Sequence, residues 1–280
     1  MTAMDSFTSP VLTIDVDGQV ATLWLDRPEA RNAMGPDMWA DLPRAAHVLG
    51  EEPDLRALVI AARGPHFSVG LDLKSMGGAL TGGGEGRPRS QASKARRTRD
   101  EVKRLQDSIT AVERLPFPVI AAVHGYCIGG GVDLIAACDI RLASADAVFS
   151  VREAKIAIVA DLGSLQRLPR IISSGHLAEL AFTGKDIGAA RAREIGLVND
   201  VYDDHAALMT AAYELADEIA HNSPVAVQGT KAVLAANDGR TVAEGLDFVA
   251  VWNAGALESD DLVEAMTAFM EKRSPVFKGH

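Results

Sequence analysis

The spacing of apolar residues predicts mixed strands and helices in the first part of the chain. Residues 11–25 alternate or run apolar on either side of an Asp-Gly pair, which indicates a β-hairpin. Residues 36–49 carry apolar positions at helical spacing, and residues 57–62 form a short apolar run typical of a buried strand. The pattern therefore predicts a core in which strands and helices both take part.

A helical stretch with many basic residues follows at 94–114, and a second buried strand is predicted at 118–123. The chain then turns through Gly129, Gly130 and Gly131 into a short helix. The remaining predicted elements of this part are that helix at 132–137, strands near 140–142 and 148–151, and a helix that begins near Asp161.

Two loops are predicted between the strand at 57–62 and the basic helix. Residues 63–76 mix Gly, Pro and His around the segment FSVGLDL at 67–73. Residues 77–90 hold six glycines and one proline, a composition that predicts a mobile loop. This loop is expected to form part of the wall of a ligand pocket.

From about residue 204 the spacing of apolar residues is helical only. Four predicted helices occupy residues 204–221, 224–236, 242–257 and 262–272. We therefore expect two regions, a mixed core over residues 1–203 and a helical region over residues 204–280.

Composition restricts the binding partners and the cellular compartment that we expect for this chain. The formal net charge of −10 over 280 residues argues against nucleic acid or an anionic membrane as the main partner. No apolar run approaches the roughly 20 residues that span a bilayer, and residues 1–10 lack the features of a secretory signal. Cys127 and Cys138 lie in apolar surroundings, which favours buried thiols over a zinc site or a disulfide. A cytoplasmic protein without a metal is expected.

The glycines at 129–131 do not match a nucleotide-binding loop, because a dinucleotide fingerprint would need glycine where Leu134 stands and no Gly-Lys-Ser/Thr follows. Glycines at this place can still let a ligand approach the main chain at the start of a helix, with tight strand–helix packing as the alternative. The chain also turns at Gly70-Leu71 after a strand. One N–H group from each turn would form an oxyanion hole for a carbonyl that becomes an enolate.

Six motifs run in order along nearly the whole chain. They are RPxxRNA (27–33), FSVGLDL (67–73), VHGYCIGGGVDL (123–134), ACDIR (137–141), QRLPR (166–170) and FMEKR (269–273). Together they resemble the crotonase (enoyl-CoA hydratase/isomerase) superfamily. The resemblance implies an α/β fold, a crotonase-like spiral of ββα units with a helical C-terminal trimerisation region, often assembled as a dimer of trimers.

The resemblance also implies a fatty acyl-CoA thioester as substrate, with coenzyme A as part of the substrate and no separate cofactor. The motif positions of the oxyanion donors are the N–H groups of Leu71 and Gly130. Lys272 would meet CoA phosphates, from this chain or from a neighbouring subunit, or complement the C-terminal end of its helix. The positions implied to bind substrate or CoA are Ala33, Gly70, Asp72, Leu73, Lys74 and Lys272.

Asp133, Glu153 and Asp161 decide which reaction is expected. In the hydratases of the superfamily, the first two positions are both glutamates and the third is usually glycine. The chain resembles instead the Δ3,5-Δ2,4-dienoyl-CoA isomerase branch, which has Asp, Glu and Asp. Moving two double bonds into conjugation is a 1,5-proton shift, so we expect Glu153 as base at C2 and Asp161 as acid at C6. Asp133 would tune or orient the pair, and apolar neighbours should raise the carboxyl pKa values.

Simpler interpretations stay open for each acid. Asp133 could complement the first turn of its helix, Glu153 could pair with Arg152 or Lys155, and Asp161 could be a helix N-cap. The competing functions are a 2-enoyl-CoA hydratase, a Δ3-Δ2-enoyl-CoA isomerase and a non-catalytic acyl-CoA-binding scaffold. The scaffold would be expected to lack these acids or the glycine turn.

Overall fold

The structure, a computed structural model, describes residues 7–80 and 90–280 and begins with the predicted hairpin. Strands β1 (Leu12–Asp17) and β2 (Val20–Leu25) pair antiparallel, with Leu12 opposite Leu25 and Asp17 opposite Val20. Gly18 takes a φ of +57° in the turn, a conformation that glycine adopts without steric cost. The Asp-Gly signal is therefore confirmed.

Within the described residues, the main sheet has six strands in the order β1-β2-β3-β4-β6-β9. The added strands, all parallel to β2, are β3 (Ala57–Ala62), β4 (Val119–Val123), β6 (Ile140–Ser144) and β9 (Asp200–Tyr202). Every residue of β2, β3 and β4 is buried. Continuous apolar runs of this kind are typical of parallel strands that are covered on both faces.

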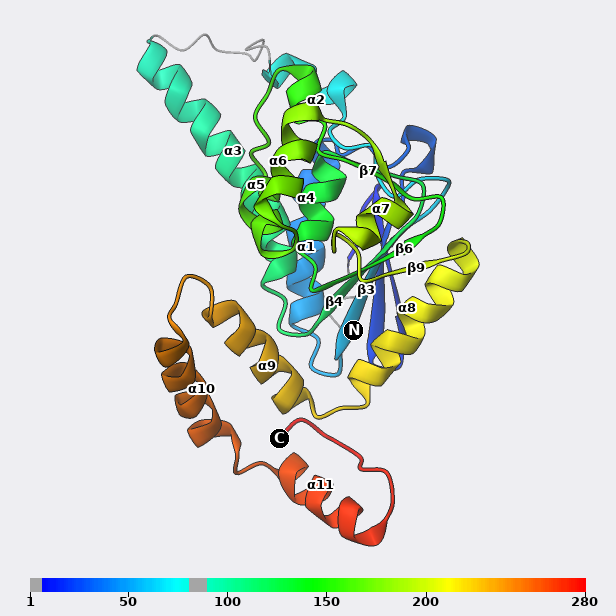
Figure 1. The fold of residues 1–280 in the computed structure, drawn as a ribbon, viewed down its shortest axis with the longest axis vertical. Helices are drawn as coiled ribbons and strands as arrows, with labels where there is room; N and C mark the ends of the chain where they lie inside the picture. The colour runs from blue at the N-terminus through cyan, green and yellow to red at the C-terminus, as the bar shows by residue number, and fades with distance from the viewer. Residues whose placement is uncertain (1–6, 81–89) are drawn as a thin grey trace.

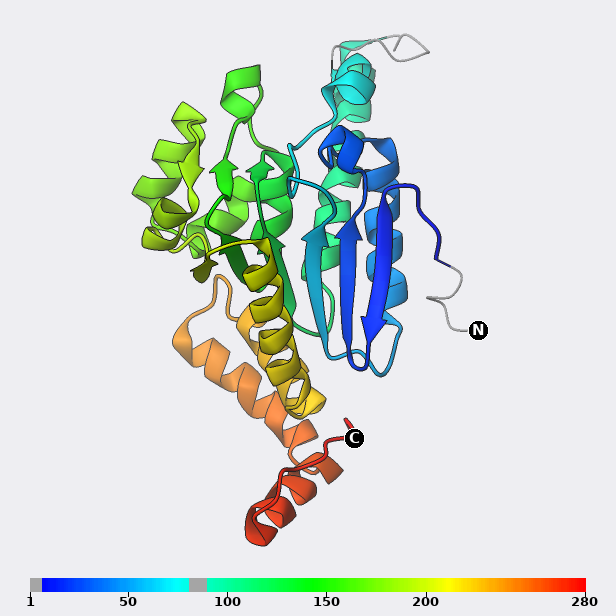
Figure 2. The ribbon, with the colours of Figure 1, turned by 90° about the vertical axis from the view of Figure 1, so that its right-hand side faces the viewer.

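Helices cover the two faces of the sheet (Figure 2). On one face, Leu23 and Ile60 pack in a cluster with α1 (Pro36–Gly50), α3 (Gln91–Glu113) and α4 (Gly130–Ala136). On the other face, the alternate residues of the strands pack against α8 (His205–Ala220). The alternation of side chains along each strand thus divides the core into two layers.

A second, smaller sheet and short helices surround the end of the main sheet. β5 (Tyr126–Ile128) pairs parallel with β7 (Val148–Ser150), which pairs antiparallel with β8 (Ile187–Gly188). The sequence pattern did not predict β5 or β8, because two or three residues give no usable period. The short helices are η2 (Pro28–Ala30), η3 (Glu153–Ile156), α5 (Ser164–Arg167), η4 (Leu168–Arg170), α6 (Ser174–Thr183) and α7 (Ala189–Glu194).

The loop prediction for residues 63–90 is partly wrong, because α2 (Leu73–Leu80) forms within it. The Asp72 carboxylate accepts hydrogen bonds from the N–H groups of Lys74 (3.1 Å) and Ser75 (3.3 Å). Such a cap satisfies donors that a helix start leaves free, and here it outweighs the low helix propensity of Gly77. Residues 81–89 of the predicted glycine-rich loop lie outside the described residues.

Helices α9 (Pro224–Ala236), α10 (Val242–Ala256) and α11 (Asp260–Glu271) complete the chain. Figure 1 shows them extending from the lower end of the body, whereas α8 packs on the sheet. A boundary at residue 204 would therefore separate α8 from the sheet it covers, and the division into two regions stays a prediction. Among the described residues, no helix combines the length and apolar character that a membrane crossing needs.

The alanines of α8 allow this helix to approach the sheet closely, and a larger side chain there tests the packing. Ala212 is fully buried between α8 and the sheet. We expect Ala212→Leu to lower the free energy of unfolding by about 1–3 kcal/mol, because extra methylene groups in a packed interior force strain. Denaturant titration measures the change. Ala206→Leu, the same substitution on the exposed face of α8, is the control and should leave stability almost unchanged.

Candidate active site

Main-chain pairing brings the two predicted oxyanion loops together. The N–H group of Ser68 donates to the Tyr126 carbonyl at 2.8 Å, and the N–H group of Ile128 donates back to the Ser68 carbonyl at 3.0 Å. On the other side of the first loop, the Met34 N–H group donates to the Gly70 carbonyl at 2.7 Å. The loop after β3 is thereby held between the chain at Met34 and strand β5.

The contact between the loops requires glycine. Gly70 has a φ of +83°, and a Cβ there would stand 2.6 Å from the Ile128 carbonyl oxygen and 3.4 Å from the Gly130 nitrogen. A Cβ at Gly130 would stand 2.8 Å from the sulfur of Met34. Among the described residues, neither the Leu71 N–H nor the Gly130 N–H donates a hydrogen bond within the protein. Two backbone donors are therefore available beside each other.

Asn32 anchors the first loop. In the sequence it stands out only as part of the RPxxRNA motif at 27–33. It is fully buried; its side-chain Oδ1 accepts from the Arg27 N–H at 2.8 Å, and its side-chain NH2 group donates to the Arg63 and His66 carbonyls, each at 2.9 Å. Its φ of +54° is in the left-handed region that asparagine tolerates better than most residues. The buried amide thus ties the chain before α1 to the loop after β3.

Asp133 is buried at 1% exposure on the first turn of α4. One carboxyl oxygen accepts the backbone N–H of Ser164 at 2.6 Å. Burial and then the nearby charge of Glu153 raise the pKa of Asp133 to about 7, against the opposing effect of the Ser164 hydrogen bond. Ser164 was missed in the sequence, because nothing in its neighbourhood there points to a residue on α4.

Glu153 lies against the glycine turn at the start of η3. A Cβ at Gly129 would stand 3.2 Å from Glu153 Oε1, and Glu153 Oε2 is buried without a hydrogen-bond partner among the described residues. Burial raises the pKa of Glu153, and the charge of Asp161 adds to the effect. Arg152 forms its ion pair with Asp186 instead, so local pairing with Arg152 does not explain Glu153.

Asp161 is not a helix cap. The helix predicted near Asp161 starts at Ser164, and its N-cap is Gly163, with a φ of +128° and no side-chain capping bond. Among the described residues, no other residue donates a hydrogen bond to the Asp161 carboxyl, although Gln106 donates to the Asp161 backbone carbonyl at 2.6 Å. The residue is exposed, yet the protein around its carboxyl still raises the pKa through desolvation.

The three carboxyl groups share one electrostatic environment. The charges of Glu153 and Asp161 both raise the pKa of Asp133, and that of Asp161 also raises the pKa of Glu153. Desolvation is the largest cause for each group. In the part of the chain that the structure describes, no cluster of His, Cys, Asp and Glu side chains could hold a metal ion. The arrangement can accept and donate protons next to two backbone N–H donors.

The other residues predicted to bind the substrate or CoA do not all lie together in the structure. Leu73 (51% exposed) and Lys74 are open to solvent at the start of α2, next to the Leu71 loop. Asp72 is buried and forms an ion pair with Arg27 at 2.8 Å, so its carboxylate is engaged within the protein. Lys272 ends α11, which Figure 1 places at the opposite end of the molecule from α2. This chain therefore does not bring Lys272 to Lys74.

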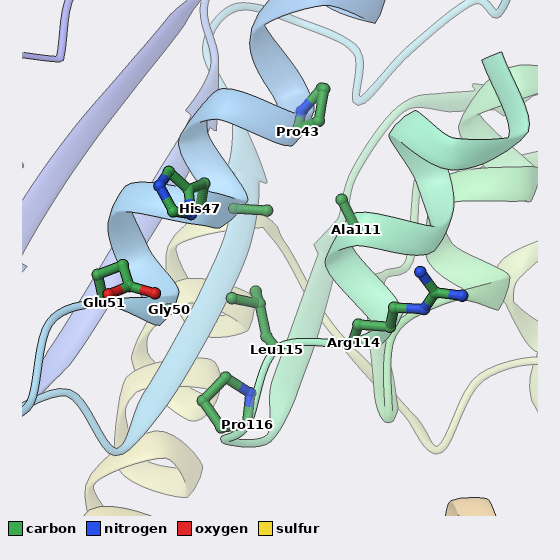
Figure 3. A pocket seen from close by; sticks show the side chains of 9 residues that line it. Pro43, His47, Gly50, Glu51, Ala111, Arg114, Leu115 and Pro116 are labelled. Carbon is green, nitrogen blue, oxygen red and sulfur yellow. The ribbon is translucent and has the colours of Figure 1, made fainter. Parts of the chain in front are cut away.

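A surface cleft of about 310 Å³ lies between the C-terminal ends of α1 and α3, where His47, Glu51 and Arg114 line it (Figure 3). It adjoins the segments that lead into β3 and β4, whereas the Gly70 loop follows the carboxyl end of β3. Ligands of parallel sheets bind outside the carboxyl ends of the strands. The cleft also lacks all three carboxyl groups described above, so the active site is assigned to the glycine loops.

Known proteins resemble the chain over nearly its whole length. The sequence model of the family described as Enoyl-CoA hydratase/isomerase matches residues 15–280. The peroxisomal Δ(3,5)-Δ(2,4)-dienoyl-CoA isomerase of Arabidopsis thaliana is 42% identical over 98% of this chain and 98% of its own length. The mitochondrial enzyme of that name from Homo sapiens is 42% identical over 89% of this chain and 75% of its own length.

Among solved structures, an enoyl-CoA hydratase from Bacillus anthracis superposes with a TM-score of 0.87 at 32% identity, over 96% of this chain and 100% of that one. A second hydratase, from Streptomyces coelicolor, gives a TM-score of 0.87 at 30% identity over 98% of each chain. The expectation of a cytoplasmic setting is contradicted, because the dienoyl-CoA isomerases at 42% identity are named as peroxisomal and mitochondrial proteins.

The raised pKa of Asp133 predicts a pH-dependent stability effect. Between about pH 4 and pH 7 the folded state holds a proton that the unfolded chain has released, so the contribution of Asp133 to stability falls as the pH rises. We expect Asp133→Asn to gain roughly 2–3 kcal/mol relative to the native chain between pH 5 and pH 8, at about 1.36 kcal/mol per pKa unit.

Denaturant unfolding at the two pH values measures this gain. Asp217→Asn, which changes an exposed carboxylate on α8, is the control and should show the same stability difference at both. An equal effect of Asp133→Asn at pH 5 and pH 8 would contradict the raised pKa.

Proposed function

The chain belongs to the enoyl-CoA hydratase/isomerase family, and we propose that it isomerises 3,5-dienoyl-CoA to the conjugated 2,4-dienoyl-CoA. The relatives named as dienoyl-CoA isomerases, 41–44% identical over most of the chain, support this reaction within the family. The superposed hydratases confirm the predicted crotonase-like α/β fold. The observation that carries the choice of reaction is Asp161, a third carboxyl group that caps no helix.

The geometry supports a 1,5-proton shift. The thioester oxygen accepts hydrogen bonds from the Leu71 and Gly130 N–H groups, which stabilise the negative charge as a dienolate forms. Ionised Glu153 takes a proton from C2; the C2–H electrons form the C1=C2 bond and the C1=O electrons move to the thioester oxygen, which gives the dienolate. As the C1=O bond forms again, the C1=C2 electrons move to C2–C3, the C3=C4 electrons move to C4–C5, and the C5=C6 electrons take a proton at C6 from protonated Asp161. Exchange with solvent restores both acids.

Two acids are needed because C2 and C6 are far apart on the substrate. A single carboxyl group can carry a proton between neighbouring positions, as in a 1,3-shift, and a hydration needs no acid at C6. Desolvation raises the pKa of Glu153 and of Asp161, which brings proton transfer closer to balance near neutral pH. Asp133 would tune or orient the pair, and the Ser164 N–H group holds its carboxyl in place.

The substrate is an acyl-CoA thioester. Ala33, Gly70 and Leu73 border the oxyanion loop, and the exposed Lys74 offers a positive charge to the CoA phosphates. Asp72 contributes indirectly, since its ion pair with Arg27 and its cap on α2 fix this wall of the site. The reaction exchanges protons and leaves the oxidation state unchanged, so no cofactor is required beyond the CoA of the substrate.

The alternative reactions are a 2-enoyl-CoA hydration and a Δ3-Δ2 isomerisation. A hydratase would use two carboxylates to hold one water molecule, but one oxygen of Asp133 is engaged by the Ser164 N–H. Neither alternative gives Asp161 a role. A scaffold without activity would not require three carboxyl groups with raised pKa values beside two free backbone donors.

Substitution of Asp161 tests the reaction. We expect Asp161→Ala to lower the turnover of 3,5-dienoyl-CoA by at least about 100-fold, within the range by which a positioned acid or base accelerates a reaction. The absorbance of the conjugated 2,4-dienoyl product follows the turnover, and thermal unfolding checks the fold. Asp107→Ala, an exposed carboxylate on α3, is the control.

The same assay separates the alternatives. Unchanged turnover in Asp161→Ala would refute the role of this acid. Native protein that consumes 2-enoyl-CoA by hydration and leaves 3,5-dienoyl-CoA unconverted would favour the hydratase.

We also propose that the chain self-associates through α9, α10 and α11, as a trimer or a dimer of trimers. These helices expose many large apolar side chains, and large exposed apolar patches mark contact sites in soluble proteins. The most exposed are Leu234, Val242, Leu246, Val251, Val263, Met266, Phe269 and Met270, each at least 59% exposed. A neighbouring copy could then supply Lys272, which this chain holds far from its own Lys74.

Light scattering tests the assembly. The native chain should give the mass of a trimer or hexamer at micromolar concentration, and the double variant Leu246→Lys with Val251→Lys should dissociate, because buried unpaired ammonium groups are costly. Val16→Lys, which adds one positive charge at an exposed position on β1, is the control. A monomeric native protein would contradict the proposal.

A further inference from the structure

The segment that carries Asp161 makes few backbone hydrogen bonds. η3 ends at Ala157, which takes a left-handed φ of 60°, and α5 begins only at Ser164. Ile158 still donates to the Glu153 carbonyl at 3.2 Å. For residues 159–161, the hydrogen bond from Gln106 to the Asp161 carbonyl is the sole one to the backbone within the described chain. Ala160 and Leu162 on either side are buried in the core, and the peptide group of Asp161 is held in addition by a contact from a distant element.

Gln106 comes from a well-anchored part of α3. Its neighbours Leu105 and Ile109 are buried in the core, and the Ser108 hydroxyl is buried and donates to the Trp39 carbonyl on α1 at 2.7 Å. Gln106 itself is half-buried, and its side-chain nitrogen lies 2.6 Å from the Asp161 oxygen, 55 residues away in sequence. Helix α3, which is anchored in the core, thus holds the peptide group of Asp161 in a segment that makes few backbone hydrogen bonds.

We propose that Gln106 is a positioning residue that holds Asp161 where its carboxyl group can deliver the proton to C6. This role rests on the proposed dienoyl-CoA isomerisation and adds a residue to it. The hydrogen bond to the Asp161 carbonyl fixes the orientation of the peptide group after Asp161, and with it the direction of the Cα–Cβ bond. Because the amide of Gln106 is neutral, it does this without adding charge beside an acid that must hold a proton.

Glu153 does not depend on Gln106 in the same way. It belongs to η3 and packs against Gly129. Loss of the Gln106 contact should therefore impair proton delivery at C6 and leave proton removal at C2 working. The two steps of the reaction can be measured separately, because removal and return of the C2 proton in D2O introduces deuterium into the recovered 3,5-dienoyl-CoA.

The test uses Gln106→Met, which keeps the length of the side chain and removes the donor, and Gln106→Asn, which keeps the amide on a shorter side chain. Gln166→Met is the matched control, since Gln166 is exposed on α5 and its side chain makes no hydrogen bond among the described residues. Isomerisation is followed by absorbance, and deuterium at C2 by mass spectrometry of unreacted substrate. Both rates come from one preparation, so their ratio is independent of any unfolded fraction.

We expect Gln106→Met to lower isomerisation by about 10- to 100-fold, the loss typical of a displacement of about 1 Å at a reacting group. Exchange at C2 should stay within about 2-fold of the native rate. Gln106→Asn should fall between Gln106→Met and the native protein, and Gln166→Met should match the native protein in both rates.

Two results would overturn the role of Gln106. One is native isomerisation in Gln106→Met, and the other is an equal fall of isomerisation and exchange, which would mean that Gln106 only supports the structure of the site. Failure of the native protein itself to convert 3,5-dienoyl-CoA would overturn the proposed function, and the role of Gln106 with it.

Discussion

The Ile128 carbonyl oxygen occupies the space where a side chain at Gly70 would begin, and this contact brings two separate parts of the chain together at backbone distance. The hydrogen bonds of Ser68 with Tyr126 and Ile128 hold the contact in register. Because the loops meet through main-chain atoms, the N–H groups of Leu71 and Gly130 are left beside each other without partners among the described residues. The carboxyl groups can exchange protons with a bound thioester only if they lie near this pair of donors.

Desolvation of the acids follows from the same arrangement. α4 starts at the glycine turn, so Asp133 on its first turn is buried, and Glu153 packs against Gly129. Burial raises the pKa values of all three acids, which disfavours their ionised forms in the folded protein and suits them to proton transfer. The desolvation of these carboxyl groups therefore lowers the stability of the folded protein and serves the proposed dienoyl-CoA isomerisation.

Much of the fold could be predicted from the sequence, because periodicity is strong where one face of an element is buried. The predicted strand at 57–62 and the helix at 224–236 have the same ends as β3 and α9. The prediction was wrong for α2, since the cap by Asp72 prevails over the glycines around Gly77, and the helix expected near Asp161 begins only at Ser164. Ser164 and Gln106 could not be found, since each acts on a residue far away in sequence.

The sequence by itself determined the order of most elements and the family through its motifs, and it singled out Asp133, Glu153 and Asp161 as the proposed acids. These depend on residue type and local spacing, which one chain displays directly. Only the tertiary structure decided that Asp161 caps no helix, that Ser164 binds Asp133, and that Gln106 holds the Asp161 segment. The reason is physical: hydrogen bonds between distant residues, and the desolvation that shifts a pKa, depend on distances that exist only once the chain has folded.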